Sequence, residues 1–321
     1  MGRTLSACMI FSAIALCLTN DGWASEIKYV ASTAIVEHPA LNAIRDGLRD
    51  GLRNKGYDDS TLKFTFESAQ GSPATAAQIA RKLAGAGPDV IVPITTPSAQ
   101  AVVASSNHIP VVFSAISDPV GANLVQDLDK PSATVTGIAD IPDFGKSLAM
   151  VKAIVPSAQT IGIPHNPGEP NAVDALARIR AAANITGIKI IATTAHRSSD
   201  VQAAAQALVG KVDAIYIPLD NTVVSALESV LKVGIDNRIP VFATDTHSVE
   251  RGSVAALGYD QYDIGLQTAD IVDKILKGAR VSDIPVAMPR LVQLYVNARA
   301  AEQMGVNIPQ DVLKQAAHVV R

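Results

Sequence analysis

The chain has 321 residues, of which 48% are hydrophobic and 18% are charged, a composition typical of folded globular proteins and not of disordered ones. This length suggests roughly two domains. A formal net charge of −3 provides no broad basic surface for nucleic acid or anionic membranes, so the expected partner is a small molecule or another protein.

The N-terminus has the pattern of a cleaved export signal. Arg3 precedes an apolar run over residues 5–18, and small residues lead to an expected cut after Ala24. The run is shorter than the ~20 residues that span a bilayer. Cleavage would remove both cysteines, Cys8 and Cys17, so the mature chain is expected to lack disulfides and Cys-bound metal. We expect a periplasmic protein, with lipid anchoring the less favoured alternative.

The first half of the mature chain alternates between strand-like and helix-like segments. Apolar runs without strict alternation, such as VIVPI, are typical of strands that are covered on both faces. Ser72 and Pro73 have the residue types that begin a helix. In chain order, the expected strands are 27–33, 61–68, 89–94, 109–115 and 133–140, and the expected helices are 38–54, 72–87 and 98–106.

The second half repeats this rhythm. The expected strands are 160–164, 188–194, 213–218, 239–245, 253–258 and 291–297, and the expected helices are 143–155, 169–184, 199–208, 221–234, 260–278 and 298–305. Strands that alternate with helices of this length predict parallel sheets built from βαβ units.

One strand-forming phrase occurs twice. NHIPVVFSA begins at Asn107 and NRIPVFATD begins at Asn237. Each follows a strand, a polar loop and a helix in the same order, which favours two similarly built lobes. A chance likeness between two Val- and Ile-rich strands stays open as an alternative, because the vocabulary of strands is narrow.

We therefore expect the α/β class, with two doubly wound parallel-sheet lobes joined by a hinge of three crossovers. The expected division is a signal peptide at 1–24, lobe 1 at 25–138 plus 259–289, and lobe 2 at 139–258 plus 290–321.

Ligands of open parallel sheets bind beyond the carboxyl ends of the strands. Lobe 1 places hydroxyl groups there, ahead of helix starts that suit an anion such as a carboxylate. Lobe 2 places carboxylates there that could hold an ammonium group, so an α-amino acid would suit both. Each of these residues could instead cap a helix. The full set is Ser32, Thr33, Glu37, His38, Gln70, Thr95, Thr96, Ser98, Ser114, Ser117, Asp118, Asn166, Glu169, Asn171, His196, Asp220, Asn221, Asp245, Thr246 and His247.

Motifs of the common enzyme classes are absent from the sequence. It has no G-x-G-x-x-G after a strand, no P-loop and no G-x-S-x-G. The six histidines lack H-x-x-x-H spacing, so we expect neither a metal site nor a cofactor. A carboxylate pair such as Glu169 and Asp220 leaves a secreted α/β hydrolase as an alternative, and a ligand sensor for a membrane signalling partner is another.

Several motifs in order carry a family resemblance, among them FSAISDPVGANLV (113–125), NPGEPN (166–171) and PLDNT (218–222). From about residue 28 to its end, the chain resembles the ABC transporter substrate-binding proteins of the tryptophan/tyrosine uptake type. The resemblance implies a type I periplasmic binding fold that closes on an aromatic or related amino acid. It also implies delivery of that solute to a membrane permease and its ATPase. We expect the receptor to be a monomer.

The chain departs from the family pattern beside the expected cleft, where Pro164, His165 and Pro170 replace residues common in the family. Candidates for an apolar wall are Phe113, Tyr216, Tyr259 and Tyr262, which could equally be core residues. The predicted ligand contacts are Ser32, Thr96, Ser98, Ser114, Asp118, Asn166, Glu169, Asp220, Asn221 and Asp245.

Overall fold

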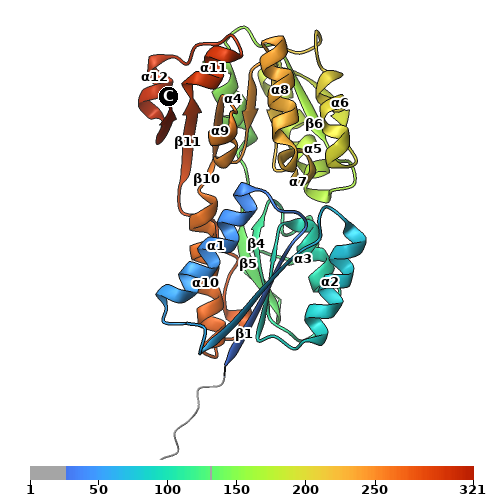
Figure 1. Cartoon of the computed structure of the whole chain (residues 1–321), viewed down its shortest axis with the longest axis vertical. Coiled ribbons are helices and arrows are strands. Elements are labelled where there is room, and N and C mark those ends of the chain that lie inside the picture. Colours follow the sequence, from blue (N-terminus) through green and yellow to red (C-terminus); the bar gives the residue numbers. More distant parts are fainter. Residues whose placement is uncertain (1–26, 131) are drawn as a thin grey trace, which may run out of the picture.

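The computed structural model describes residues 27–130 and 132–321. The expected export signal at 1–24, with both cysteines, lies outside the described residues. Two α/β lobes are stacked along the long axis of the molecule, each with one sheet covered by helices (Figure 1). The α/β class with mostly parallel sheets, expected from the strand–helix alternation, is confirmed.

Lobe 1 contains a five-stranded parallel sheet in the order β2-β1-β3-β4-β5. Its strands are β1 Lys28–Ala34, β2 Leu62–Ser68, β3 Val90–Ile94, β4 Val111–Ile116 and β5 Val135–Ala139. The strand order reverses between β1 and β3. In a sheet of this kind the connections after these two strands leave in opposite directions and open a crevice for ligands.

Helices cover both faces of this sheet. They are α1 Pro39–Asn54, α2 Pro73–Gly85, α3 Thr96–Val103 and α10 Gln261–Leu276, with a 3-10 turn η2 at Val281–Asp283. Val90 and Val92 pack in the core beneath α1 and α10, whereas Ile91 packs in the core beneath α2 and α3. Because both faces are covered, β3 is apolar at every position, as the sequence pattern indicated.

Lobe 2 contains a seven-stranded sheet in the order β12-β11-β10-β9-β8-β6-β7. Its strands are β6 Thr160–His165, β7 Lys189–Thr194, β8 Ala214–Ile217, β9 Val241–Ala243, β10 Ala255–Tyr259, β11 Val292–Asn297 and β12 His318–Val320. Its helices are α4 Phe144–Ile154, α5 Pro170–Thr186, α6 Val201–Gln206, α7 Asn221–Ser225, α8 Leu227–Asn237, α9 His247–Arg251, α11 Ala298–Gln303 and α12 Gln310–Gln315, with η1 at Ser198–Asp200. β11 is antiparallel to β10, and the other pairs are parallel.

The phrase that occurs twice in the sequence occupies matching places in the two lobes. The first copy contains β4, which follows β3 in the order β2-β1-β3-β4-β5. The second contains β9, which follows β8 in the order β7-β6-β8-β9-β10. The repeated residues therefore form the fourth strand of the same arrangement in both lobes.

The chain passes between the lobes at three places. The first passage leads from β5 to α4, the second from β10 to α10, and the third from η2 to β11. Ala287, in the third passage, accepts a hydrogen bond from Ala139 N at 2.9 Å and donates one to Gly137 O at 2.9 Å. The third passage thus lies beside the end of β5, and Figure 1 shows the passages together on one side of the molecule.

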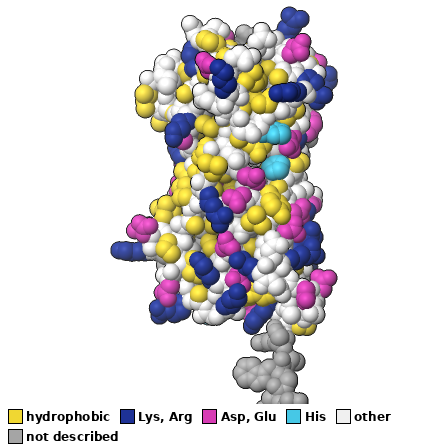
Figure 2. Space-filling view, turned by 90° about the vertical axis from the view of Figure 1, so that its left-hand side faces the viewer, with side chains coloured by type: hydrophobic (Ala, Val, Ile, Leu, Met, Phe, Trp, Pro, Cys, Tyr) yellow, Lys and Arg dark blue, Asp and Glu magenta, His cyan; other side chains and the backbone are white. Residues whose placement is uncertain are grey.

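The surface carries mixed charge. Figure 2 shows Lys and Arg side chains interspersed with Asp and Glu, most densely on the lower lobe. There Asp270 pairs with Lys55 at 2.7 Å and with Arg290 at 3.3 Å. Exposed pairs of this kind contribute little to stability. Within 27–130 and 132–321, no helix combines the length and the apolar character needed to span a bilayer.

Candidate ligand-binding site

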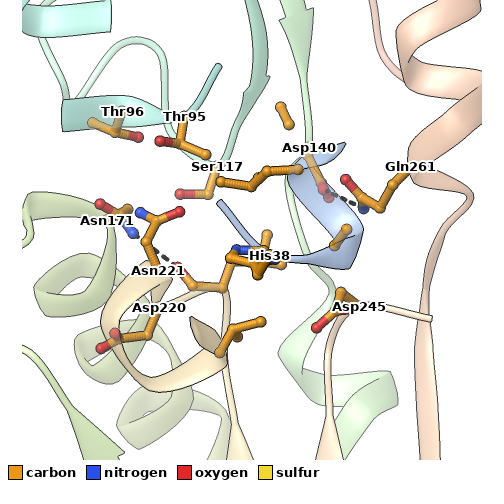
Figure 3. Close-up of a pocket in the computed structure, with 15 residues that line it drawn as sticks. His38, Thr95, Thr96, Ser117, Asp140, Asn171, Asp220, Asn221, Asp245 and Gln261 are labelled. Atoms are coloured by element: carbon orange, nitrogen blue, oxygen red, sulfur yellow. Dashed lines mark hydrogen bonds between the residues drawn. The ribbon is translucent and has the colours of Figure 1, made fainter. Parts of the chain in front are cut away.

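A cavity lies between the lobes, where the carboxyl ends of the two sheets face each other (Figure 3). Its empty space is about 450 Å³, including the part open to solvent, and the centre of a water molecule can occupy about 40 Å³ of it. The residues that line this interlobe cavity are His38, Ala40, Leu41, Thr95, Thr96, Ala115, Ser117, Asp140, Asn171, Leu219, Asp220, Asn221, Val224, Asp245 and Gln261.

The lobe 1 wall comes from the loops that the strand order predicts. His38 follows β1, Thr95 and Thr96 follow β3, and Ser117 follows β4. In Figure 3 the two threonines and Ser117 lie opposite Asn171 and Asn221, with His38 to the right of Asn221. The switch point between β1 and β3 therefore supplies His38, Thr95 and Thr96, and the neighbouring strand β4 supplies Ser117.

The backbone of this wall is strained. Thr95 has a φ of 72° and Ala115 has a φ of 57°, in the left-handed region that residues with a Cβ rarely adopt. Hydrogen bonds from Thr95 N to Ser114 O at 3.1 Å and from Ala99 N to Thr95 O at 3.0 Å hold the first of these. Strain of this kind is found at functional sites, where surrounding structure maintains it.

Four buried polar atoms around the cavity have no hydrogen-bond partner within the described residues. These four unpartnered atoms are Thr95 Oγ1, Ser117 Oγ, His38 Nδ1 and Asn171 Oδ1. The residues that carry them are each at most 7% exposed. Native proteins pair the great majority of such groups, so a cluster of four around one cavity indicates that a polar molecule completes them.

His38 faces the cavity as a neutral imidazole. The pKa of His38 is lowered to about 3, chiefly by burial and then by the charges of Arg251 and His247. A neutral ring offers one donor and one acceptor.

The helices that begin at the cavity differ in their caps. No side chain caps α1 or α3 at its N-terminus. By contrast, Asp220 caps α7 through Val223 N and Asp260 caps α10 through Tyr262 N and Asp263 N. The free N–H groups of α1 and α3 therefore suit an anionic group in the cavity.

Glu169 has a structural role in lobe 2. Its carboxylate accepts hydrogen bonds from Asn221 N at 3.1 Å and Nδ2 at 2.6 Å, and from Thr222 N at 2.9 Å and Oγ1 at 2.6 Å. Asn171 Nδ2 adds another at 3.2 Å. The start of α7 uses both oxygens of Glu169, and Glu169 lies outside the lining of this cavity.

Asp220 lines the cavity but is also engaged by the protein. Its Oδ1 accepts from Val223 N at 2.9 Å and its Oδ2 accepts from Asn166 N at 2.6 Å. Burial, followed by the nearby charge of Glu169, raises the pKa of Asp220 well above its usual range. A carboxyl group with a raised pKa, whose two oxygens already accept backbone hydrogen bonds, is a weak partner for a cation.

Asp140 and Asp245 complete the acidic lining. Asp245 accepts from Ser248 N at 2.9 Å and from Ser248 Oγ at 2.6 Å. Asp140 accepts from Gln261 Nε2 at 3.2 Å. Burial raises the pKa of Asp140 to about 6; the hydrogen bond from Gln261 opposes this rise and the charge of Asp245 adds to it.

The predicted contacts are divided between the cavity and other places. Thr96, Asp220, Asn221 and Asp245 line the cavity. The remaining predicted contacts, which the structure places elsewhere, are Ser32, Ser98, Ser114, Asp118, Asn166 and Glu169.

Three of these residues lie inside lobe 1. Ser32 donates to Val92 O at 3.0 Å, and Ser114 shares a hydrogen bond with Thr268 at 2.8 Å. Ser98 is buried in α3. Side chains alternate along a strand, so a polar residue within a strand can point to a helix and away from the strand end.

The other three line neighbouring hollows. Asp118 borders a hollow next to Gly168 and Asp174, and its Oδ1 accepts from Gly121 N at 2.8 Å. Asn166 and Glu169 border another hollow, beside His196.

Six polar lining residues were not among the predicted contacts: His38, Thr95, Ser117, Asp140, Asn171 and Gln261. His38, Thr95, Ser117 and Asn171 belong to the wider set of polar residues after strands. Asp140 ends a predicted strand, so the rule that ligands bind beyond the carboxyl ends of strands also points to Asp140. Gln261 lies at the start of a predicted helix, and its approach to Asp140 depends on the path of the second passage.

None of the four aromatic candidates, Phe113, Tyr216, Tyr259 and Tyr262, belongs to the lining of the cavity. Phe113 and Tyr216 are fully buried in the lobe cores, and Tyr216 packs edge-on against Phe144 with ring centroids 6.5 Å apart. Tyr262 is 38% exposed. The apolar part of the lining is aliphatic, with Leu41, Leu219 and Val224 as its largest side chains.

The family model for ABC transporter substrate binding proteins matches residues 29–320, nearly the whole described chain. The chain belongs to this family. A curated member, the tyrosine-binding protein of Clostridioides difficile (strain R20291), is 34% identical over 271 residues, which cover 84% of this substrate-binding protein and 79% of the relative.

Solved structures support the same assignment. A conserved domain protein from Vibrio cholerae has 45% identity and a TM-score of 0.90, with 92% of this chain and 100% of that chain covered. A domain from Streptococcus pneumonia in complex with L-Trp has 32% identity and a TM-score of 0.88, at the same coverage.

A third solved neighbour is described as ligand-free and open. The ligand-free, open structure of CD0873 from Clostridium difficile has 35% identity and covers 92% of this chain and 99% of that chain, yet its TM-score is 0.68. The substrate-binding protein described here is thus nearer to the L-Trp complex than to the open structure.

Proposed function

We propose that this substrate-binding protein is the periplasmic receptor of an ABC importer and that it binds an α-amino acid in the interlobe cavity. The observation that carries the proposal is the set of four unpartnered atoms around the cavity. A buried polar atom without a partner costs about 1–3 kcal/mol, so a polar ligand that completes all four gains substantial affinity.

The carboxylate of the ligand binds at the lobe 1 wall. The uncapped N-termini of α1 and α3 present free N–H groups and positive helix-dipole ends. The hydroxyls of Thr95 and Ser117 are donors of the right kind beside them. No Lys or Arg belongs to the described lining, so backbone and hydroxyl groups carry this recognition.

The side chain of the ligand is hydrophobic. Leu41, Leu219 and Val224 form the apolar part of the lining. One relative is named for tyrosine and one solved neighbour holds L-Trp, which supports aromatic amino acids as the first probes. The proposal includes delivery of the solute by a monomeric receptor to a permease and its ATPase.

Isothermal titration tests this proposal. We expect L-tyrosine or L-tryptophan to bind with a Kd near 1 μM, which corresponds to about −8 kcal/mol. Tyramine and tryptamine, which lack the carboxylate, should bind at least tenfold more weakly. Mass spectrometry of the recovered ligand should show it unchanged, as a receptor requires.

Absence of binding heat from all twenty amino acids would remove the amino-acid assignment. Equal affinity for tyrosine and tyramine would instead overturn the carboxylate site at α1 and α3. Chemical conversion of the ligand would favour the hydrolase alternative.

A further inference from the structure

The interlobe cavity has an unbalanced charge. Three carboxyl groups line it, those of Asp140, Asp220 and Asp245, and each residue is at most 4% exposed. Within the described residues, no Lys or Arg side chain lines the cavity, and the neighbouring His38 is neutral. A buried carboxylate without a cation is costly, so the missing positive charge is expected to come from a ligand.

The protein already satisfies two of these groups. Asp220 accepts backbone N–H groups at both oxygens, and Asp245 accepts from the backbone and the hydroxyl of Ser248. Asp140 is different, because its Oδ2 has one hydrogen bond at 3.2 Å, from Gln261, and its Oδ1 has no partner within the described chain.

The position of Asp140 connects it to the hinge. It follows β5 directly, in the first passage between the lobes. Its partner Gln261 is the first residue of α10, at the end of the second passage, and also donates to Tyr259 O at 3.4 Å. A charge bound at Asp140 therefore lies where two of the three passages meet.

We propose that Asp140 binds the protonated α-amino group of the ligand through its free Oδ1. This assignment rests on the proposed function and replaces Asp220, the acidic residue that the sequence favoured as the ammonium partner. The carboxylate and ammonium of one amino acid would then contact the lobe 1 wall and the hinge, respectively. Such a charge-assisted bond is short and strong because both groups are desolvated.

Neutralisation of Asp140 by the ammonium group of the ligand also couples ligand binding to closure of the lobes. Burial raises the pKa of Asp140 to about 6, which reflects the cost of a lone charge in this environment. A bound ammonium group removes that cost only while the cavity stays closed around it. The ligand therefore stabilises the closed arrangement more than the open one, which is the condition for a ligand-driven shift.

The test compares two ligands on two proteins. L-tyrosine and L-tryptophan are measured beside 3-(4-hydroxyphenyl)propionate and 3-indolepropionate, which lack only the amino group. Wild type should prefer each amino acid over its deaminated partner by about 30-fold or more. Asp140→Asn, which keeps the shape of the side chain, should reduce that preference to within about threefold.

Asp143→Asn is the matched control, because Asp143 lies in the same passage outside the cavity lining and Asn can replace it as the N-cap of α4. This variant should keep the preference for amino acids. A preference that survives in Asp140→Asn and disappears in the control would overturn the assignment.

A crystal structure of wild type with L-tyrosine provides a measurement without a variant. The ligand nitrogen should lie within about 3.2 Å of Asp140 Oδ1, and a nitrogen placed on Asp220 or Asp245 would contradict the proposal. If wild type binds none of the four probes, the proposed function itself fails. Binding of the amino acids with an unaltered preference in Asp140→Asn refutes only the role of Asp140.

Discussion

At the scale of single residues, the acidic groups around the cavity differ in how far the protein itself satisfies them. Glu169 and Asp220 both follow strands and both could hold a cation by residue type. In the folded chain the N-terminus of α7 takes up both carboxyl groups. Sequence reasoning pointed to this loop, which borders the cavity, but could not separate caps from ligand contacts, because both roles use the same residue types.

Asp140 makes the stability of the ligand-free protein depend on pH. Its pKa is raised to about 6, chiefly by burial, so the folded protein keeps a proton between about pH 4 and 6 that the unfolded chain has released. This contribution to stability is complete below pH 4 and is lost as the pH rises through 6. The groups that face Asp140 are Asp245, Tyr216 and Tyr259, and both tyrosines stay neutral over this range.

We therefore expect Asp140→Asn to raise the free energy of unfolding by about 3 kcal/mol at pH 7.5, since one pKa unit corresponds to about 1.4 kcal/mol. Near pH 4 the variant and wild type should be almost equally stable. Urea denaturation of the ligand-free proteins at both pH values measures this. An equal gain at both pH values would mean that ionisation of Asp140 does not destabilise the fold.

At the scale of elements, α1 and α10 lie unusually close to each other on one face of lobe 1. A Cβ on Gly47 would lie 2.2 Å from Tyr262 O, and a Cβ on Gly265 would lie 2.2 Å from Ile44 O. Two glycines thus let the helix backbones touch. Because Gln261 begins α10, this contact also fixes the position of Gln261 beside Asp140.

Gly265→Ala should destabilise the protein by about 1–3 kcal/mol, because the new methyl group meets backbone atoms of α1 that cannot rotate away. Thermal denaturation measures the loss. Gly85→Ala is the control: Gly85 lies in α2, a Cβ there meets no atom within 4 Å, and the variant should gain up to about 1 kcal/mol. Equal effects of the two substitutions would argue against the close contact.

Most elements follow from their sequence patterns, and the exceptions have physical causes. The buried strands β3 and β8 were predictable from apolar runs, since a sheet covered on both faces demands them. The helix expected at 221–234 is divided into α7 and α8 at Ala226, whose φ of −117° interrupts it. α12 and β12 were missed, because β12 is only three residues long and pairs with β11 alone.

At the scale of the whole molecule, the cavity lies between two lobes that three passages of the chain connect. The TM-score is 0.88 against an L-Trp complex and 0.68 against an open, ligand-free neighbour, so this chain is the more similar to the ligand-bound structure. Lobe 1 contributes the wall formed by α1 and α3, and lobe 2 contributes the loop before α7. A ligand that contacts both lobes therefore favours closure.

Small-angle X-ray scattering tests this closure directly. Ligand-free protein should have a larger radius of gyration than protein saturated with L-tyrosine or L-tryptophan, because only the closed lobes contact both ends of the ligand. At a ligand concentration of 100 times Kd, mass action should also add about 2.7 kcal/mol of stability, visible as a higher Tm. Asp140→Asn at the same amino-acid concentration should compact less. Binding heat with no change in the scattering profile would refute a closing receptor and favour a rigid binding protein.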